Sequence, residues 1–362
     1  MTGIVLHVRQ GFEDDAAKEL AARLKAHEIL CTITHAQEDT AFVIAHLQEQ
    51  ELKKARISLR FEDLIFARQL LWMSCKTTLP ESGDRASPLI HAVSAELLPL
   101  AGSNAFSGLF LETPDTDSSK ELTGFCKSLT RPVEAALNKL KLLPKGKGAA
   151  HLPRAHLIMI SNREVLVTVA DPQNANPWSM GIPRLKFPPQ APSRSTLKLE
   201  EAFLIFLGLT GMENLLKPGM TAADLGACPG GWTFQLVKHR MHITAVDNGS
   251  IDSKLMSTGL VTHHREDAFR FRPHETLDWM VCDVVEQPSR ITDLVGEWFI
   301  HGHCRRTIFN LKLPMKKRFE EVEQCLASLS SRCKSAGRPL TIKAKQLYHD
   351  RKEITVFAEL NI

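Results

Sequence analysis

Carboxylates recur in the second half of the sequence where short apolar runs end. The acidic residues are Asp224, Asp247, Asp267 and Asp283, and a lysine, Lys312, ends a further run. Because helical patterns lie between these runs, we expect a mostly parallel sheet whose ligand-binding edge is formed by the carboxyl ends of its strands. Carboxylates at such an edge can accept hydrogen bonds from ribose hydroxyls. A lysine there can act as a base where burial and a nearby cation lower its pKa.

A glycine-rich turn follows the first of these runs and precedes a helical pattern. Residues 221–233 read TAADLGACPGGWT, with glycine at 226, 230 and 231. Glycine permits positive φ and lets a ligand approach the backbone closely, and amides at a helix start can face that ligand. An NAD-dependent dehydrogenase would need the spacing G-x-G-x-x-G, which this turn lacks. A tight strand-to-helix turn without a ligand is the other interpretation.

The pattern D-L-G-x-x-P-G-G-W in this turn resembles motif I of class I S-adenosylmethionine (SAM) methyltransferases, in the branch that methylates ribose 2′-hydroxyls. The resemblance implies SAM as the cofactor. It places Asp224 near the amino-acid end of SAM, Asp247 at its ribose and Asp267 at its adenine. The cofactor-binding residues expected on this basis are Ser195, Asp224, Gly226, Cys228, Pro229, Gly230, Gly231, Trp232, Asp247, Asp267 and Asp283.

A second segment precedes this turn. Residues 193–199, SRSTLKL, predict the start of a helix, with Ser195 or Thr196 as N-cap and two glutamates in the first turn. The segment is similar to one that precedes motif I in the ribose methyltransferases. By that similarity Lys198 reaches the active site and Ser195 lies against SAM.

Four residues match the K-D-K-E tetrad of 2′-O-methyltransferases that resemble the heat-shock rRNA methyltransferase. They are Lys198, Asp283, Lys312 and Glu353, the last at the start of a predicted strand over 354–357. The resemblance implies that Lys312 takes the proton of the ribose hydroxyl and that Asp283 orients this lysine. Lys198 and Glu353 would position the ribose. No metal ion is needed for this chemistry.

Three longer runs resemble one family in particular, the bacterial 23S rRNA cytidine 2′-O-methyltransferases that act in the peptidyl-transferase region. The runs are DLGACPGGWT, NLKLPMKKR at 310–318 and QLYHDR at 346–351, and the correspondence covers residues 183–357. The partner implied is 23S rRNA or a ribosomal precursor. The cations Lys316, Lys317 and Arg318 would then hold the RNA backbone.

The fold class expected is α/β, with a Rossmann-like methyltransferase sheet at 195–362. Residues 1–80 predict an α+β subdomain, with strands at 4–8, 29–34 and 41–45 and a helix at 14–26. Residues 88–171 predict a second α+β subdomain, similar in plan to THUMP-like RNA-binding units. It includes a helix over 122–143 broken by Pro132. Six prolines between 172 and 192 predict an extended connector at 172–194.

A loop at 141–154 carries cations among glycines. These are Lys141, Lys145, Lys147 and Arg154. Such a loop can hold phosphates without reading sequence, and a solvated surface loop explains the same composition equally well.

Composition indicates an ordinary globular chain of more than one domain. The sequence has 362 residues, of which 43% are hydrophobic and 24% charged, and its net charge is +4, with the positive excess beyond residue 170. No apolar run reaches the ~18 residues of a membrane span, and we expect no membrane partner and no secretory signal. The eight cysteines form no C-x-x-C pair, so we expect no metal site and a cytoplasmic location. We expect a monomer.

Alternative functions remain open at this point. One is a non-catalytic rRNA-binding or ribosome assembly factor, and another is a 2′-O-methyltransferase for a different RNA. Methyltransferases that act on proteins or small molecules commonly use an Asn-Pro-Pro motif. The strand at 279–282 here ends in Cys-Asp-Val-Val instead, which disfavours that class.

Overall fold

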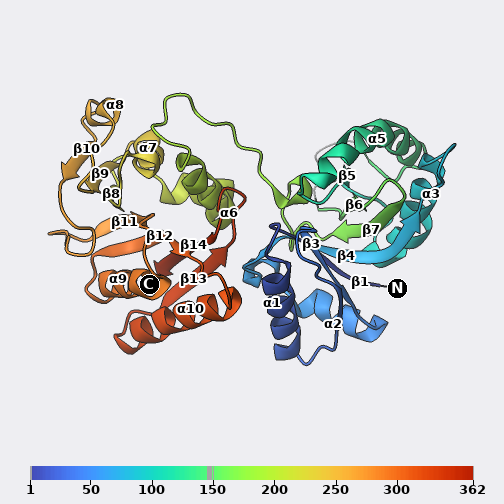
Figure 1. Ribbon diagram of the computed structural model, residues 1–362, viewed down its shortest axis with the longest axis horizontal. Coiled ribbons are helices and arrows are strands. Elements are labelled where there is room, and N and C mark those ends of the chain that lie inside the picture. Colours follow the sequence, from blue (N-terminus) through green and yellow to red (C-terminus); the bar gives the residue numbers. More distant parts are fainter. Residues whose placement is uncertain (1, 145–148, 150, 362) are drawn as a thin grey trace. The chain divides into compact units, whose positions relative to one another are not determined.

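The computed structural model describes residues 2–144, 149 and 151–361. The chain forms two compact units, residues 1–183 and 184–362, and each contains one seven-stranded sheet. Figure 1 shows the first unit in blue to green and the second in green to red. The boundary falls inside the predicted connector, where the described backbone has one short 3-10 turn, Ser179–Gly181, and no α-helix or strand up to Ser195.

The N-terminal sheet has the strand order β2-β3-β1-β4-β7-β6-β5. Its strands are β1 (Gly3–Val8), β2 (Thr32–His35), β3 (Phe42–His46), β4 (Ala67–Thr78), β5 (Leu109–Glu112), β6 (Arg154–Met159) and β7 (Glu164–Ala170). The long strand β4 pairs with β1 on one side and with β7 on the other. The two predicted subdomains, 1–80 and 88–171, therefore contribute to one continuous sheet.

Five α-helices are described in this unit, with shorter helical turns between some of them. They are α1 (Glu13–Ala26), α2 (Glu49–Ser58), α3 (Ala86–His91), α4 (Leu98–Ala101) and α5 (Leu122–Lys139). The predicted break at Pro132 was wrong, because α5 runs through it. Leu129, Val133 and Leu137 are buried on one face of this helix, and this packing offsets the backbone hydrogen bond that proline removes. Of the loop cations, Lys145 and Lys147 lie outside the described residues.

The C-terminal sheet has the order β10-β9-β8-β11-β12-β14-β13. The first five strands in this order, from β10 to β12, run parallel to one another. Strand β14 is antiparallel to both of its neighbours, β12 and β13. Their bounds are β8 (Thr221–Leu225), β9 (His242–Val246), β10 (Val261–His264), β11 (Leu277–Cys282), β12 (Cys304–Lys312), β13 (Leu340–Lys345) and β14 (Glu353–Leu360). The predicted mostly parallel α/β sheet is thus confirmed.

The helices of this unit precede, connect or follow its parallel strands. They are α6 (Thr196–Leu215), α7 (Gly231–Lys238), α8 (Ser253–Met256), α9 (Pro288–Ile300) and α10 (Arg318–Ser335). Helix α6 begins where predicted, but Ser195 makes no side-chain capping bond and the first turn contains no acidic residue. Ser195 is the N-cap residue, as predicted, but the two glutamates lie beyond the first turn, so their predicted position was wrong.

The core of the C-terminal unit lies between α6 and the sheet. Phe203 contacts Trp279 edge-on, with ring centroids 6.0 Å apart, and Phe206 stacks on Phe357. Trp232 belongs to the same cluster. This packing fixes α6 against the strands and so fixes the position of any side chain on its first turns. In the described part of the chain, no helix has the length and apolar character needed to cross a membrane.

Candidate active site

The predicted acidic residues lie at the carboxyl ends of the parallel strands. Asp224 is the penultimate residue of β8, Asp247 follows β9 and Asp283 follows β11. Strands β8, β9 and β11 pair in register at their ends, since Leu225 pairs with both Val246 and Cys282. These carboxylates are therefore at one edge of the sheet, the edge at which ligands bind in such folds.

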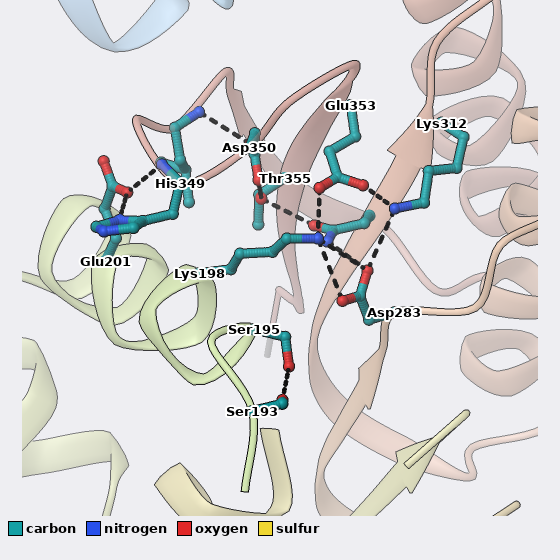
Figure 2. Close-up of polar contacts among 12 residues, drawn as sticks. Ser193, Ser195, Lys198, Glu201, Asp283, Lys312, His349, Asp350, Glu353 and Thr355 are labelled. Atoms are coloured by element: carbon teal, nitrogen blue, oxygen red, sulfur yellow. Dashed lines mark hydrogen bonds and ion pairs between the residues drawn. The ribbon is translucent and has the colours of Figure 1, made fainter. Parts of the chain in front are cut away.

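The four tetrad residues converge, although they come from four elements (Figure 2). Lys198 Nζ lies 3.3 Å from Asp283 Oδ2 and also pairs with Glu353 Oε1. Lys312 Nζ lies 3.6 Å from Asp283 Oδ1 and pairs with the other Glu353 oxygen, Oε2. Each amine thus contacts both carboxylates. Pairing of Lys312 on β12 with Glu353 on β14 is built into the strand register.

Lys312 has a lowered pKa, which favours loss of its proton. Burial lowers the pKa of Lys312 below its usual 10.5, and the neighbouring cation Lys198 lowers it further. The carboxylate of Asp283 acts in the opposite direction, and the net pKa remains lowered. Burial and a nearby cation are the two causes predicted from the sequence. The lysine side chain is still 27% exposed, so a substrate can reach it.

The glycines of motif I are required by the protein's own packing. A Cβ at Gly226 would lie 2.6 Å from a methyl group of Val284, and one at Gly231 would lie 2.1 Å from Ser195 Oγ. Gly226 and Gly230 also have positive φ. Within the chain, the space beside Gly226 and Gly231 is already filled by Val284, Ser193 and Ser195, and this brings the start of α6 close to the start of α7.

Asp247 organises the same turn. Its Oδ2 accepts a hydrogen bond from the Cys228 amide at 3.0 Å, and its Oδ1 accepts one from the Gly249 amide at 2.7 Å. The peptide between Cys228 and Pro229 is cis, and both residues are exposed. Because each carboxylate oxygen has a second lone pair, Asp247 can hold the turn and still accept a hydrogen bond from a ligand.

Asp224 differs from its neighbours because it is buried, with an exposed fraction of 1%. Burial raises its pKa to about 7, and the Thr233 hydroxyl, which donates to Oδ2 at 2.6 Å, opposes that shift. The residue therefore supports the turn from beneath.

The remaining predicted cofactor residues occupy diverse environments. Ser195 Oγ lies 2.7 Å from Ser193 Oγ. Trp232 is 2% exposed and packs in the core, where its indole nitrogen has no hydrogen-bond partner. Asp267 is exposed, and its Oδ1 accepts a bond from the Phe269 amide. The edge of the sheet is therefore accessible at Cys228, Pro229 and Asp267.

Sequence reasoning did not identify several polar residues around the tetrad. Asn310 donates to Asp283 Oδ1 at 2.7 Å. Glu201, one turn beyond Lys198 on α6, accepts bonds from the amides of Tyr348 and His349 and from the His349 ring. A buried glutamate in a helix is a signal that could have indicated Glu201, but its partners are remote in the chain.

Two further features of the described residues bear on the chemistry. No group of three or more His, Cys, Asp or Glu side chains there is placed to hold a metal ion. A surface hollow of about 670 Å³ in the N-terminal unit is lined by Ser94, Leu98, Pro99, Gly102, Ser103 and Asn104. It contains no titratable side chain, so it offers no acid or base.

The parallel sheet, the glycine turn and the converging lysines and carboxylates define the C-terminal unit as a SAM-dependent methyltransferase domain. Residues 191–333 match the family described as FtsJ-like methyltransferase. Residues 1–71 match the RlmM ferredoxin-like domain, and residues 84–171 match the N-terminal region of ribosomal RNA large subunit methyltransferase M.

Full-length relatives give the narrower assignment. Ribosomal RNA large subunit methyltransferase M of Xanthomonas campestris is 44% identical over 358 residues, covering 99% of this chain and 99% of the relative. The protein of the same name from Methylococcus capsulatus is 44% identical over 360 residues, covering 99% and 98%. The chain belongs to the family of ribosomal RNA large subunit methyltransferase M. A solved structure, TrmN from Thermus thermophilus, is 16% identical, covers 99% of this chain and 100% of its own, and has a TM-score of 0.37.

Proposed function

We propose that this chain transfers a methyl group from SAM to the ribose 2′-oxygen of a cytidine in 23S rRNA. The observation that carries the proposal is the convergence of Lys198, Lys312, Asp283 and Glu353 at the carboxyl edge of the sheet. Amines and carboxylates in mutual contact can move a proton from a hydroxyl without a metal ion.

Lys312 is the general base in this proposal. Its pKa is lowered by burial and by Lys198, so a larger fraction is neutral near pH 7 than for an ordinary lysine. The neutral amine accepts the proton of the 2′-hydroxyl as the oxygen attacks. Asp283 and Glu353 hold the amine in position and stabilise the ammonium that forms.

Lys198 positions the ribose in this proposal and does not accept the hydroxyl proton. It is paired with both carboxylates, which fix its direction. The ammonium can donate to the ribose oxygen as negative charge develops there. Alignment of the hydroxyl with these groups supplies much of the acceleration, since well-oriented reactants gain roughly 7–11 kcal/mol.

SAM, when bound, supplies an electrophilic methyl group on a sulfonium. The residues that would hold it are those at the strand ends and in motif I, with Asp247 at the ribose and Asp267 at the adenine. The exposure of Cys228, Pro229 and Asp267 supports this placement. Ser195, Asp224, the three glycines and Trp232 shape the turn beneath it.

The RNA substrate is assigned from the family and from the surface cations. Lys316 and Lys317 are exposed directly after Lys312, where they can contact phosphates beside the reacting ribose. The target cytidine is proposed to be unpaired, since an unstacked nucleotide can turn out of the RNA toward the active site. A monomer working in the cytoplasm on rRNA or a ribosomal precursor completes the proposal.

Mapping of 2′-O-methyl groups in rRNA tests the function directly. Ribosomal RNA from cells with the gene, without it and with only the Lys312→Ala form is compared. We expect one cytidine in 23S rRNA to lose its 2′-O-methyl group in the last two. An unchanged map in the strain without the gene would refute the function.

A further inference from the structure

A chain of buried polar groups leads from the loop before β14 to the tetrad. Asp350 is fully buried and lies 3.0 and 3.1 Å from Thr355 Oγ1 through its two oxygens. The same hydroxyl lies 2.8 Å from Asn310 Oδ1, and Asn310 Nδ2 donates to Asp283. Figure 2 shows Asp350 and Thr355 in contact with each other beside the tetrad residues.

Counting donors along this chain determines where a proton must be. Asp283 as a carboxylate only accepts, so the Asn310 amide must turn its NH₂ to Asp283 and its oxygen to Thr355. Thr355 has a single hydroxyl proton. If that proton goes to Asn310, Asp350 must itself donate to Thr355, and only a protonated carboxyl can do so. With an ionised Asp350, one close contact would place two acceptors face to face without a proton between them.

The surroundings of Asp350 favour the protonated form. Burial raises the pKa of Asp350 to about 7, and the carboxylate of Glu201 on α6 acts in the same direction. Lys198 on α6 opposes the rise in this pKa, and Lys312 on β12 also has a Coulombic interaction with the Asp350 carboxyl. The Leu347 amide donates to Asp350 Oδ2 at 2.9 Å, which leaves Oδ1 to carry the proton toward Thr355.

We propose that Asp350, as a neutral carboxylic acid, is a positioning residue for methyl transfer that orients Asp283 through Thr355 and Asn310. The inference rests on the proposed function of the tetrad. Asp350 donates to Thr355, Thr355 to Asn310, and Asn310 to Asp283 Oδ1, the oxygen 3.6 Å from Lys312 Nζ. The last bond draws negative charge away from the lysine, so that Lys312 gives up its proton more readily.

Substitutions that keep or break this row of hydrogen bonds distinguish a positioning role from a purely structural one. Asp350→Asn keeps a donor toward Thr355 and an acceptor toward Leu347, and Thr355→Ser keeps the hydroxyl. Thr355→Val preserves shape and strand preference but removes the donor that fixes Asn310, which can then turn its NH₂ toward Asp350. Tritiated SAM and unmodified 23S rRNA give kcat and KM for each form, and calorimetry gives the SAM affinity.

We expect Thr355→Val to lower kcat about tenfold, the factor associated with one hydrogen bond to a charged group. Asp350→Asn and Thr355→Ser should stay within about threefold of the unaltered chain. KM for RNA and the SAM affinity should not change. In Thr355→Val the rise of kcat with pH should also move to higher pH, because Asp283 then holds the Lys312 proton more tightly. A purely structural defect would lower kcat equally at every pH.

Two outcomes would overturn the inference while the proposed function stands. One is a kcat for Thr355→Val equal to that of the unaltered chain. The other is an Asp350→Asn form as slow as Thr355→Val, which would show that the charge of Asp350 is needed. Infrared difference spectra at about pH 5 check the protonation independently of activity, since Asp350→Asn should remove one protonated-carboxyl band. If the unaltered chain transfers no methyl group, the proposed function fails, and the infrared band still reports on Asp350.

Discussion

Each unit contains a buried carboxylate with several partners, and the two sites differ in how those partners are held. In the N-terminal unit, Glu112 at the end of β5 accepts from His7 on β1 at 3.1 Å and from His156 on β6 at 2.8 Å. Its other oxygen accepts from the Ser179 hydroxyl at 2.6 Å and the Met180 amide at 2.7 Å. These donors are on strands, a short side chain or backbone, and their positions are fixed.

In the C-terminal unit, Glu353 is equally buried, but its described partners are the amines of Lys198 and Lys312 on long flexible stems. Burial alone would raise the pKa of Glu112, yet His156 and His7 bring it well below its usual range. At the tetrad the lowered pKa belongs to Lys312. Fixed donors thus keep Glu112 ionised for structure, whereas in the proposed mechanism the amine of Lys312 accepts a proton from the substrate.

The largest expected effect follows from removing the base. Lys312→Ala should reduce kcat for methyl transfer by roughly 10²- to 10⁴-fold, the contribution of a general base. SAM affinity, measured by calorimetry, should stay within a few-fold because the residue is at the substrate side. Lys334→Ala, which removes an exposed lysine at the end of α10, is the matched control. Substantial turnover in Lys312→Ala would exclude this residue as the base.

The corresponding change at Glu112 should act on stability and leave catalysis intact. Glu112→Ala leaves two buried histidines without their acceptor, and we expect a loss of roughly 3–5 kcal/mol in the unfolding free energy of the N-terminal unit. Hydrogen exchange should accelerate in β1 and β6 and stay unchanged in β11 and β12. Glu96→Ala, at an exposed site, is the control. A large fall in kcat of the folded protein would contradict the distinction drawn between the two carboxylates.

A smaller effect is expected at the cofactor edge. Asp267→Ala should weaken SAM binding about tenfold, because one charged acceptor for the adenine is lost. Glu266→Ala removes a neighbouring exposed carboxylate and should leave the affinity unchanged. Equal affinities of the two variants by calorimetry would show that adenine is held elsewhere.

A separate effect, on the pH dependence of stability, concerns Asp224, whose pKa in the folded state is raised to about 7 by burial. The folded chain then binds this proton more tightly than the unfolded chain, so its stabilising contribution is full below about pH 4 and is lost as pH rises toward 7. With Asp224→Asn, the free energy of unfolding should fall less as the pH rises from about 4 to about 7. Urea unfolding at about pH 4 and about pH 7 measures the slope. An unchanged slope would show that Asp224 ionises normally.

The C-terminal unit was predictable because its pattern is local. Apolar runs alternate with helical patterns, so the strand ends at Asp247, Asp283 and Lys312 could be placed from the sequence. Convergence of Lys198 and Glu353 with them came from family resemblance. Spacing along the chain carries no information about side chains that meet across a sheet.

Other features could not be predicted because the residues that form them are distant from one another in the sequence. Asp350, Thr355 and Asn310 meet through bonds between β12, β14 and the loop before it. The neighbours of Gly226 and Gly231 in the folded chain, Val284 and Ser195, could not be predicted either. In each case the partner is set by tertiary packing, which leaves no periodic pattern in the sequence.

In the proposed function, the two lysines and two carboxylates promote transfer of the SAM methyl group to a ribose 2′-oxygen. Nucleoside analysis of unmodified 23S rRNA incubated with this chain and labelled SAM tests this role. We expect label in 2′-O-methylcytidine with the unaltered chain and none with Lys312→Ala. Label on a base, or equal label with both forms, would contradict it.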